Sequence, residues 1–333
     1  MEYVPMETED LTALAGNALF ITNEGNFNGD NASLSVYYPG VKRVENEIFS
    51  RKNGYKLGDV AQSMTIYDGK GYVVVNNSGV VYVVDVNNFQ LIGGIKGLVS
   101  PRYIHFVSDT KAYITDLYAS RITIFNPQTL QKIGVIQTPG HKSTEQMVQY
   151  GKYVFTNCWS YDNKLLIIDS ERDEVVDSIA LDIQPTSLVL DRYNKIWTVT
   201  DGGVNGKVHG EEAPSLYRID AATRQVERKF TFQKGDWPSE VTLNGTRDTL
   251  YYLNKDVWRL AVTTDEIPTI PFLKYSGTRY YGLAVDPVTS EVYVGDAIDY
   301  QQPGVVYRLR ANALPVDTFN VGIIPGAFCF RPH

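Results

Sequence analysis

Short apolar runs separated by polar turn residues dominate residues 61–96. Val, Ile and Tyr gather in four segments, at 63–67, 71–76, 80–85 and 90–96. Asn, Asp and Gly fill the breaks between these segments, and these residues favour tight turns. The pattern therefore predicts four antiparallel strands in one stretch of chain. One such sheet cannot bury both of its faces, so it needs further sheets to stack against it.

The same unit recurs along the chain. Each copy opens with a first strand that begins at a Pro-like position and carries two apolar residues spaced by one. The seven first strands start at Ala61, Pro101, Thr144, Pro185, Pro238, Tyr280 and Pro325. The spacings between these starts are 40, 43, 41, 53, 42 and 45 residues. Repeats of about 40 to 50 residues with four strands each are typical of a β-propeller.

The two ends of the chain predict how the ring closes. Residues 18–25 and 34–39 have the pattern of second and third strands, but no first strand precedes them. Residues 325–330 form a first strand with nothing after it, so this strand is expected to complete the N-terminal blade and remove two open sheet edges. The prediction is an all-β, seven-bladed β-propeller with four antiparallel strands per blade, in a single domain over residues 17–333. Residues 1–16 are expected to be an N-terminal tether and lead-in.

Composition limits the partners of the protein. The formal net charge of −7 argues against nucleic acid or an anionic membrane as a partner. No stretch approaches the length of a transmembrane helix, and no signal peptide is recognisable. The two cysteines, Cys158 and Cys329, fall in blades that should lie apart, so both are expected to be free thiols.

Polar residues recur at the end of each predicted second strand, where the chain turns toward the third strand. These residues are Glu24, Asn76, Asp116, Asn157, Asp201, Asn254 and Asp296. Side chains of this kind cap turns by bonding to nearby backbone N–H groups. As a set, they could also line the mouth of a central funnel and bind a ligand there.

Aromatic residues gather in loops at the same end of the predicted ring. The loops between second and third strands carry Phe27, Tyr118, Trp159, Tyr161 and Tyr300, and the loops between blades carry Tyr103, His141, Trp237, Tyr280 and Tyr281. Exposed aromatic side chains with a polar end suit a docking surface, although some of these could instead pack neighbouring blades together. Two long loops, 24–31 and 201–213, lie on the same side. The sequence therefore predicts a ligand-binding face at this end.

Catalytic motifs are scarce in the chain. It lacks a Gly-x-Ser-x-Gly elbow, a His-Glu-x-x-His pair, a Cys-x-x-Cys pair and a Gly-rich phosphate loop. The Asn- and Asp-rich loop 23–31 could hold a structural Ca²⁺ through oxygen ligands, but it lacks the EF-hand spacing, so turn chemistry is favoured. We expect a binding protein without catalytic residues rather than an enzyme.

Several segments resemble a known family. The strings YVVVN, YITDLYASRITIFNPQTL and VFTNCWSYDNKLLIIDS are similar to YncE-like propellers. The strings ITNEGNFNGDNASLSVY and TNCWSYDNK are similar to the narrower group of BtuG-like surface propellers, also called surface layer proteins. The resemblance implies a lipid-anchored protein of the outer membrane and cell surface. It also implies that the protein captures cobalamin, which would be its ligand and not a cofactor, and passes it to a BtuB-like outer-membrane transporter. By itself, the protein is expected to be a monomer.

Two other functions stay open at this point. Propeller lactonases and lyases hold a metal with Glu, Asn and Asp, and Glu24, Asn157, Asp201 and Asp296 could imitate that set. Alternatively, the loop aromatics could bind a glycan or a protein surface.

Overall fold

The middle strands of each repeat are nearly continuous apolar runs because both of their faces are covered. In β5 (Lys70–Val75) and β14 (Lys164–Asp169), every residue after the first is buried. The outermost strand β15 (Glu174–Ala180) instead contains only exposed and half-buried residues. The sheets must therefore stack on both sides of one another, and their outer strands face the solvent.

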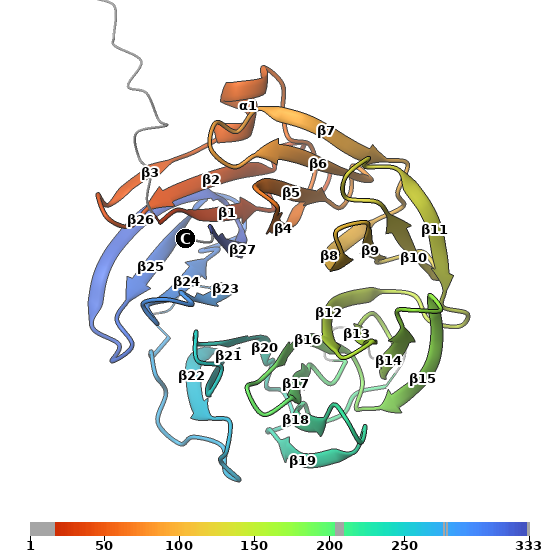
Figure 1. Ribbon diagram of the computed structural model, residues 1–333. Helices are drawn as coiled ribbons and strands as arrows, with labels where there is room; N and C mark the ends of the chain where they lie inside the picture. Colours follow the sequence, from red (N-terminus) through yellow and green to blue (C-terminus); the bar gives the residue numbers. More distant parts are fainter. Residues whose placement is uncertain (1–16, 204–209, 276, 278, 332–333) are drawn as a thin grey trace, which may run out of the picture.

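The computed structural model describes residues 17–203, 210–275, 277 and 279–331. These residues form seven antiparallel sheets, which Figure 1 shows arranged as blades in a ring. The predicted all-β, seven-bladed propeller is therefore confirmed. The predicted tether, residues 1–16, and part of the loop 201–213 lie outside the described residues.

The strands of the first four blades run from the innermost to the outermost in the following order. Blade 1 contains β27 (Pro325–Phe330), β1 (Leu19–Asn23), β2 (Ser33–Tyr38) and β3 (Arg43–Glu45). Blade 2 contains β4 (Ala61–Tyr67), β5, β6 (Val80–Asp85) and β7 (Leu91–Lys96). Blade 3 contains β8 (Pro101–Ser108), β9 (Lys111–Asp116), β10 (Arg121–Phe125) and β11 (Lys132–Gln137). Blade 4 contains β12 (Thr144–Tyr150), β13 (Tyr153–Cys158), β14 and β15.

The last three blades follow the same order, with one departure. Blade 5 contains β16 (Pro185–Leu190), β17 (Lys195–Thr200), β18 (Ser215–Asp220) and β19 (Val226–Thr231). Blade 6 contains β20 (Ser239–Leu243), β21 (Thr249–Asn254) and β22 (Asp256–Ala261). Blade 7 contains β23 (Tyr280–Val285), β24 (Val292–Asp296), β25 (Pro303–Leu309) and β26 (Pro315–Ile323). In blade 6, the fourth position is reduced to a single bridge between Val257 and Leu273.

The C-terminal strand closes the ring as predicted. β27 pairs antiparallel with β1, so that Leu19 lies opposite Phe330 and Ile21 lies opposite Phe328. β27 also lies beside β4 and β23, the inner strands of the neighbouring blades. The last and first segments of the chain are therefore joined in one sheet, which leaves β1 without an open edge.

Apolar side chains from neighbouring blades form the core between the sheets. At the joint of blades 7 and 1, Ile21 and Tyr37 share a buried cluster with Tyr293, Val306 and Phe319. The rings of Tyr37 and Phe319 stack with their centroids 3.9 Å apart. Aromatic packing of this kind adds to the apolar area that each joint buries.

One helix was not predicted from the sequence. The six-residue α1 (Ile48–Asn53) lies in the connection from blade 1 to blade 2 and buries Ile48 and Phe49. Gly54 ends it in the left-handed conformation, with φ 77°. Among the described residues, no helix has the length and apolar character that a bilayer crossing requires.

Candidate ligand-binding face and channel

A β-bulge occurs near the start of every inner strand. The strand register shifts between Ala61 and Ser63 in blade 2 and between Ser239 and Val241 in blade 6, and it shifts at the equivalent place in the other five blades. A bulged residue is left unpaired, and its side chain is turned away from the sheet face. The seven bulge positions are Gln62, Arg102, Glu145, Thr186, Glu240, Tyr281 and Gly326.

Several of the side chains at these positions contact one another around the central axis of the propeller. The Arg102 Nε lies 2.9 and 2.8 Å from the two carboxylate oxygens of Glu145, and one of its terminal nitrogens donates to the Gln62 Oε1. Tyr281 Oη donates to both carboxylate oxygens of Glu24, at 3.1 Å each. We call Glu24, Gln62, Arg102, Glu145, Glu240 and Tyr281 the polar ring.

Glu24 fills the place of the one missing side chain in this ring. A Cβ added to Gly326 would lie 2.7 Å from Glu24 Oε1, which is closer than real Cβ contacts allow. The glycine in the closing strand therefore leaves room for the carboxylate of Glu24, which comes from the end of β1. As a result, the N-terminal and C-terminal segments complete the ring together.

The polar ring contains three carboxyl groups and one guanidinium. Burial raises the pKa of Glu24 to about 7, although the positive charge of Arg102 and the hydrogen bond from Tyr281 oppose the shift. Burial also raises the pKa of Glu240 to about 8, and the negative charges of Glu24 and Glu145 add to that shift. Carboxyl groups with such pKa values exchange protons near neutral pH.

Glu240→Gln is expected to weaken the pH dependence of stability. The folded protein holds the Glu240 proton up to about pH 8, whereas the unfolded chain releases it near the ordinary pKa of 4.5, so stability falls as pH rises between these values. The neutral glutamine removes this loss. The variant should therefore melt at a higher temperature than the unsubstituted protein at pH 9, with a smaller difference at pH 5. Thermal unfolding at both pH values measures this, and a lower melting temperature for the variant at pH 9 would contradict it.

A cavity of about 600 Å³ adjoins the polar ring along the inner strands. It begins at Tyr103 and Gln146 and extends toward the turns that follow β20 and β23. Half of the residues that line it are apolar residues of the inner strands, namely Ile104, Met147, Val148, Leu188, Val189, Leu190 and Leu243. A cavity of this volume fits a small molecule, because such sites measure about 300 to 1,000 Å³.

The polar residues at the second-strand ends lie in the joints between blades. Asn76 and Asn157 each donate a hydrogen bond to the carbonyl of the first residue of the next inner strand, at 3.0 and 2.7 Å. Asp116 and Asp296 accept N–H groups both from their own loops and from the loop leading into their own blade. These four side chains are buried, so they fix the loops in the way the capping interpretation describes. Their contact with a ligand stays a prediction.

Trp159 and Asp201 form another joint, between blades 4 and 5. Trp159 Nε1 donates to Asp201 Oδ2 at 3.2 Å, and Gln184 donates to both oxygens of the same carboxylate. The guanidinium carbon of Arg102 lies 6.0 Å from the centroid of the Trp159 ring. Trp159 therefore connects the loop face to the polar ring.

The remaining predicted residues divide between the cavity wall and the loops. Tyr103 lines the cavity, and its hydroxyl accepts a hydrogen bond of 3.4 Å from Gln62. Tyr280 Oη donates to the Lys274 carbonyl at 3.2 Å. The half-exposed His141 pairs with Asp162, with 2.8 Å between Nδ1 and Oδ2.

Five of the predicted aromatic side chains are exposed on the loop face. Phe27, Tyr118, Tyr161, Trp237 and Tyr300 have exposed fractions between 36% and 68%. The Tyr300 ring also meets the Tyr281 ring edge to face, with centroids 5.8 Å apart, so the exposed set reaches the polar ring. Among the described residues, only Tyr55 and Tyr193 are further aromatic side chains of similar exposure. We call the five residues the aromatic face.

The carboxylates proposed for a metal-dependent enzyme do not converge. In the described part of the chain, one group of three metal-ligating side chains is close enough to share an ion, and it contains none of Glu24, Asp201 and Asp296. In the loop 23–31, Asn26 N–H donates to Asn31 Oδ1 at 2.7 Å, and Asn31 Nδ2 donates to Asn26 Oδ1 at 3.1 Å. These oxygens take part in turn bonds, as turn chemistry predicts. Binding of Ca²⁺ there stays untested.

Comparisons with solved structures agree with the architecture. A quinoprotein alcohol dehydrogenase-like protein from Bacteroides thetaiotaomicron is 14% identical, with a TM-score of 0.74 over 95% of this chain and 78% of that chain. The periplasmic gluconolactonase PpgL of Pseudomonas aeruginosa is 11% identical, with a TM-score of 0.71 over 95% of this chain and 99% of that one. A candidate 6-phosphogluconolactonase from Bacteroides fragilis is 11% identical, with a TM-score of 0.71 over 99% and 100% of the two chains. At these identities, the similarity establishes the fold alone.

The sequence itself matches one domain family. No curated protein matches the chain. Residues 17–315, which include most of the ring, match the family described as Domain of unknown function (DUF5074). The chain therefore belongs to the DUF5074 family.

Proposed function

We propose that the protein captures a broad, rigid ligand with polar edges, of the cobalamin class, on its aromatic face and does not transform it. The observation that carries this proposal is the exposure of five aromatic side chains on one face of the ring. Large aromatic side chains left in water bury nothing until a ligand docks on them. Cobalamin suits such a surface because its flat corrin can lie on aromatic rings while its amide edge meets polar loops.

The size of the ligand decides where it binds. A corrin disc with a nucleotide tail is larger than a typical small-molecule ligand, whereas the cavity beside the polar ring measures about 600 Å³. The ligand would therefore lie on the loop face, above the polar ring. The loops there are braced by the buried caps Asn76, Asp116, Asn157 and Asp296, so little order is lost on binding.

The proposal extends to the cellular setting that the sequence resemblance implies. The protein would be a lipid-anchored monomer at the cell surface and would pass its ligand to a BtuB-like transporter in the outer membrane. This part rests on the resemblance alone, and cell fractionation together with co-purification of such a transporter tests it.

Acid–base catalysis by the polar ring is the second candidate function. Glu24 and Glu240, with pKa values of about 7 and 8, lie near Arg102 and Tyr281, and such groups can move protons at neutral pH. Two structural neighbours are described as a gluconolactonase and a candidate 6-phosphogluconolactonase, so gluconolactone is the substrate to assay. Hydrolysis that is lost in Glu24→Gln would favour this function over capture.

Removal of exposed aromatic rings should weaken ligand binding without unfolding the protein. Tyr161→Ala with Trp237→Ala removes two side chains that are 54% and 51% exposed. We expect the affinity for cyanocobalamin to fall at least about tenfold, because buried aromatic contacts dominate binding energies. The melting temperature should stay nearly unchanged, since neither ring is buried in a joint. Isothermal titration and thermal unfolding measure the two effects.

Tyr193→Ala is the matched control for this variant. Tyr193 is 52% exposed but lies in the turn between β16 and β17, at the opposite end of the blade from the aromatic face. The control should bind cyanocobalamin as tightly as the unsubstituted protein. Equal affinities for the double variant and this control would contradict a site on the aromatic face.

A further inference from the structure

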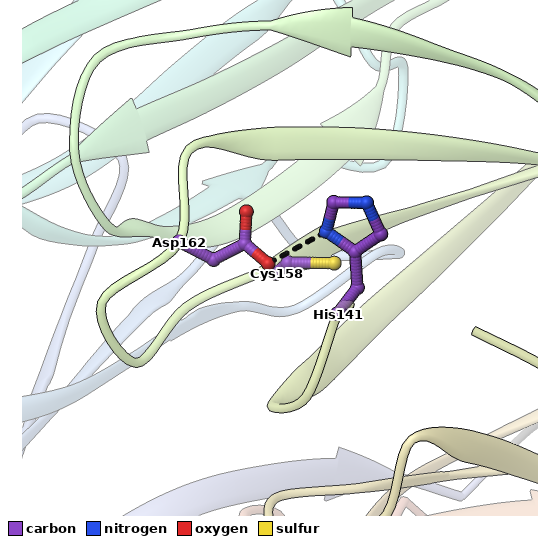
Figure 2. A group of neighbouring side chains, drawn as sticks. All are labelled: His141, Cys158 and Asp162. Atoms are coloured by element: carbon purple, nitrogen blue, oxygen red, sulfur yellow. Dashed lines mark hydrogen bonds and ion pairs between the residues drawn. The ribbon is translucent and has the colours of Figure 1, made fainter. Parts of the chain in front are cut away.

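Three side chains with metal-ligand chemistry meet at the edge of the loop face. His141 lies in the loop before β12, Cys158 ends β13, and Asp162 lies in the loop between β13 and β14. One ligand atom from each residue lies within 4.8 Å of the other two. Figure 2 shows the Cys158 sulfur and the Asp162 carboxylate pointing toward the imidazole. The hydrogen bond between His141 Nδ1 and Asp162 Oδ2 measures 2.8 Å. We call these residues the N/S/O cluster.

Backbone hydrogen bonds hold the loops that carry this cluster. The N–H of His141 donates to the Thr138 carbonyl at 3.0 Å, and the N–H of Asp162 donates to the Trp159 carbonyl at 3.0 Å. The Asp162 carbonyl accepts the N–H of Gln184 at 2.7 Å, which ties the loop to blade 5. The three side chains are therefore presented by braced turns, and this preorganisation favours ion binding.

An activated cysteine nucleophile does not explain the arrangement. Cys158 is 0% exposed, and burial raises the pKa of its thiol well above the ordinary value, with the charge of Asp162 adding to the shift. A nucleophilic thiol instead needs a lowered pKa and access to substrate. No hydrogen bond among the described residues joins the Cys158 sulfur to the imidazole, and Cys158 is not in a disulfide.

We propose that His141, Cys158 and Asp162 bind a zinc ion. Zn²⁺ takes thiolate, imidazole and carboxylate ligands together, whereas the hard ions Ca²⁺ and Mg²⁺ avoid sulfur. Tetrahedral bonds of about 2.0 to 2.3 Å place ligand atoms about 3.3 to 3.7 Å apart, so the cluster closes on the ion with a small side-chain movement. The imidazole of His141 is 28% exposed, which gives the ion a path from the solvent and leaves a fourth position for water or another ligand.

Zinc at this place would stiffen one part of the aromatic face. The turn between Cys158 and Asp162 contains Tyr161, whose backbone has φ 62°, a conformation that non-glycine residues rarely adopt. An ion bound at both ends of this turn would fix the position of the exposed Tyr161 ring. The zinc site stands on its own geometry, so it holds whether or not the face binds cobalamin.

Cobalt and zinc titration of chelator-treated protein tests the site. Co²⁺ bound by a thiolate gives a sulfur-to-cobalt charge-transfer band in the near ultraviolet. We expect this band to appear with one equivalent of Co²⁺ and to be displaced by one equivalent of Zn²⁺. We also expect Zn²⁺ to raise the melting temperature, because the ion binds the folded state in preference to the unfolded chain.

Substitutions identify the ligands. The charge-transfer band should vanish in Cys158→Ser and remain in Cys329→Ser, which changes the other free thiol of the chain. His141→Ala and Asp162→Asn should each weaken Zn²⁺ binding at least about tenfold. Absence of the band in the unsubstituted protein, or a band that persists in Cys158→Ser, would overturn the proposal even if a variant folds poorly.

Discussion

Deletion of residues 324–333 will abolish cooperative folding or lower the melting temperature by at least about 10 °C. The deletion removes β27, the innermost strand of blade 1, together with its ladder to β1 and its contacts with β4 and β23. It also exposes the edge of β1 and removes the half-buried rings of Phe328 and Phe330. A ring that has lost its closing strand has an open sheet edge at β1 and loses part of the core at two joints. Thermal unfolding followed by circular dichroism measures the loss.

Deletion of residues 1–10 is the control of equal length. These residues precede β1, the first strand that the structure describes, and the ten-residue cut leaves the described strands of blade 1 in place. The control should melt within a few degrees of the full chain. Equal losses from the two deletions would contradict the account of ring closure.

Arg102→Met should cost about 3 to 5 kcal/mol of folding free energy, because it leaves the Glu145 carboxylate buried without its partner. Glu145 is 2% exposed, and Arg102 Nε bonds both of its oxygens at 2.8 and 2.9 Å. The substitution also removes the one positive charge from the polar ring, which contains Glu24 and Glu240. Chemical denaturation at pH 7 measures the change.

The double variant Arg102→Met with Glu145→Gln separates charge from packing. If an unpaired carboxylate causes the loss, neutralising Glu145 should recover most of the stability. A double variant that is no more stable than Arg102→Met would show that lost side-chain packing causes the effect instead.

The repeat pattern was sufficient to predict the architecture. Each first strand begins at a recognisable residue, and the orphan strand 325–330 implied closure with β1, which the pairing of Leu19 with Phe330 confirms. Periodic patterns of this kind are strong because every blade must bury the same two faces. The short helix α1 and the reduced fourth position of blade 6 were not predicted, because six residues or a single bridge carry no periodic signal.

Less of the candidate site than of the fold could be predicted from the sequence. The exposed aromatic residues were identified because aromatic residues in loops are unusual, and Phe27, Tyr118 and Trp237 are exposed as expected. Asn76 and Asn157 were considered both as caps of turns and as ligand contacts at the mouth of the funnel. In the structure, both donate hydrogen bonds to the next inner strand. From sequence alone, a cap and a ligand contact look the same, because both require a short polar side chain after a strand.

Four members of the polar ring were missed although their signal is in the repeats, whereas Glu24 and Tyr281 were predicted as ligand-binding residues. Gln62, Arg102 and Glu145 each directly follow the residue that marks the start of a first strand, and Glu240 lies two residues after Pro238. A strand pattern assigns such residues to one of two faces, and only the β-bulge directs them to the axis. The N/S/O cluster was missed for another reason: His141 lies 17 residues before Cys158, in the preceding loop, so no short motif contains the set.

Isothermal titration of the unsubstituted protein with cyanocobalamin tests the central claim most directly. The account predicts one binding site per chain, with a dissociation constant below about 1 μM, since a preorganised face loses little order on binding. Removal of Zn²⁺ from the buffer should change the affinity for cyanocobalamin by no more than the loss of order in the Tyr161 turn explains. The absence of binding at about 1 mM cyanocobalamin, in protein that melts cooperatively, would contradict the account.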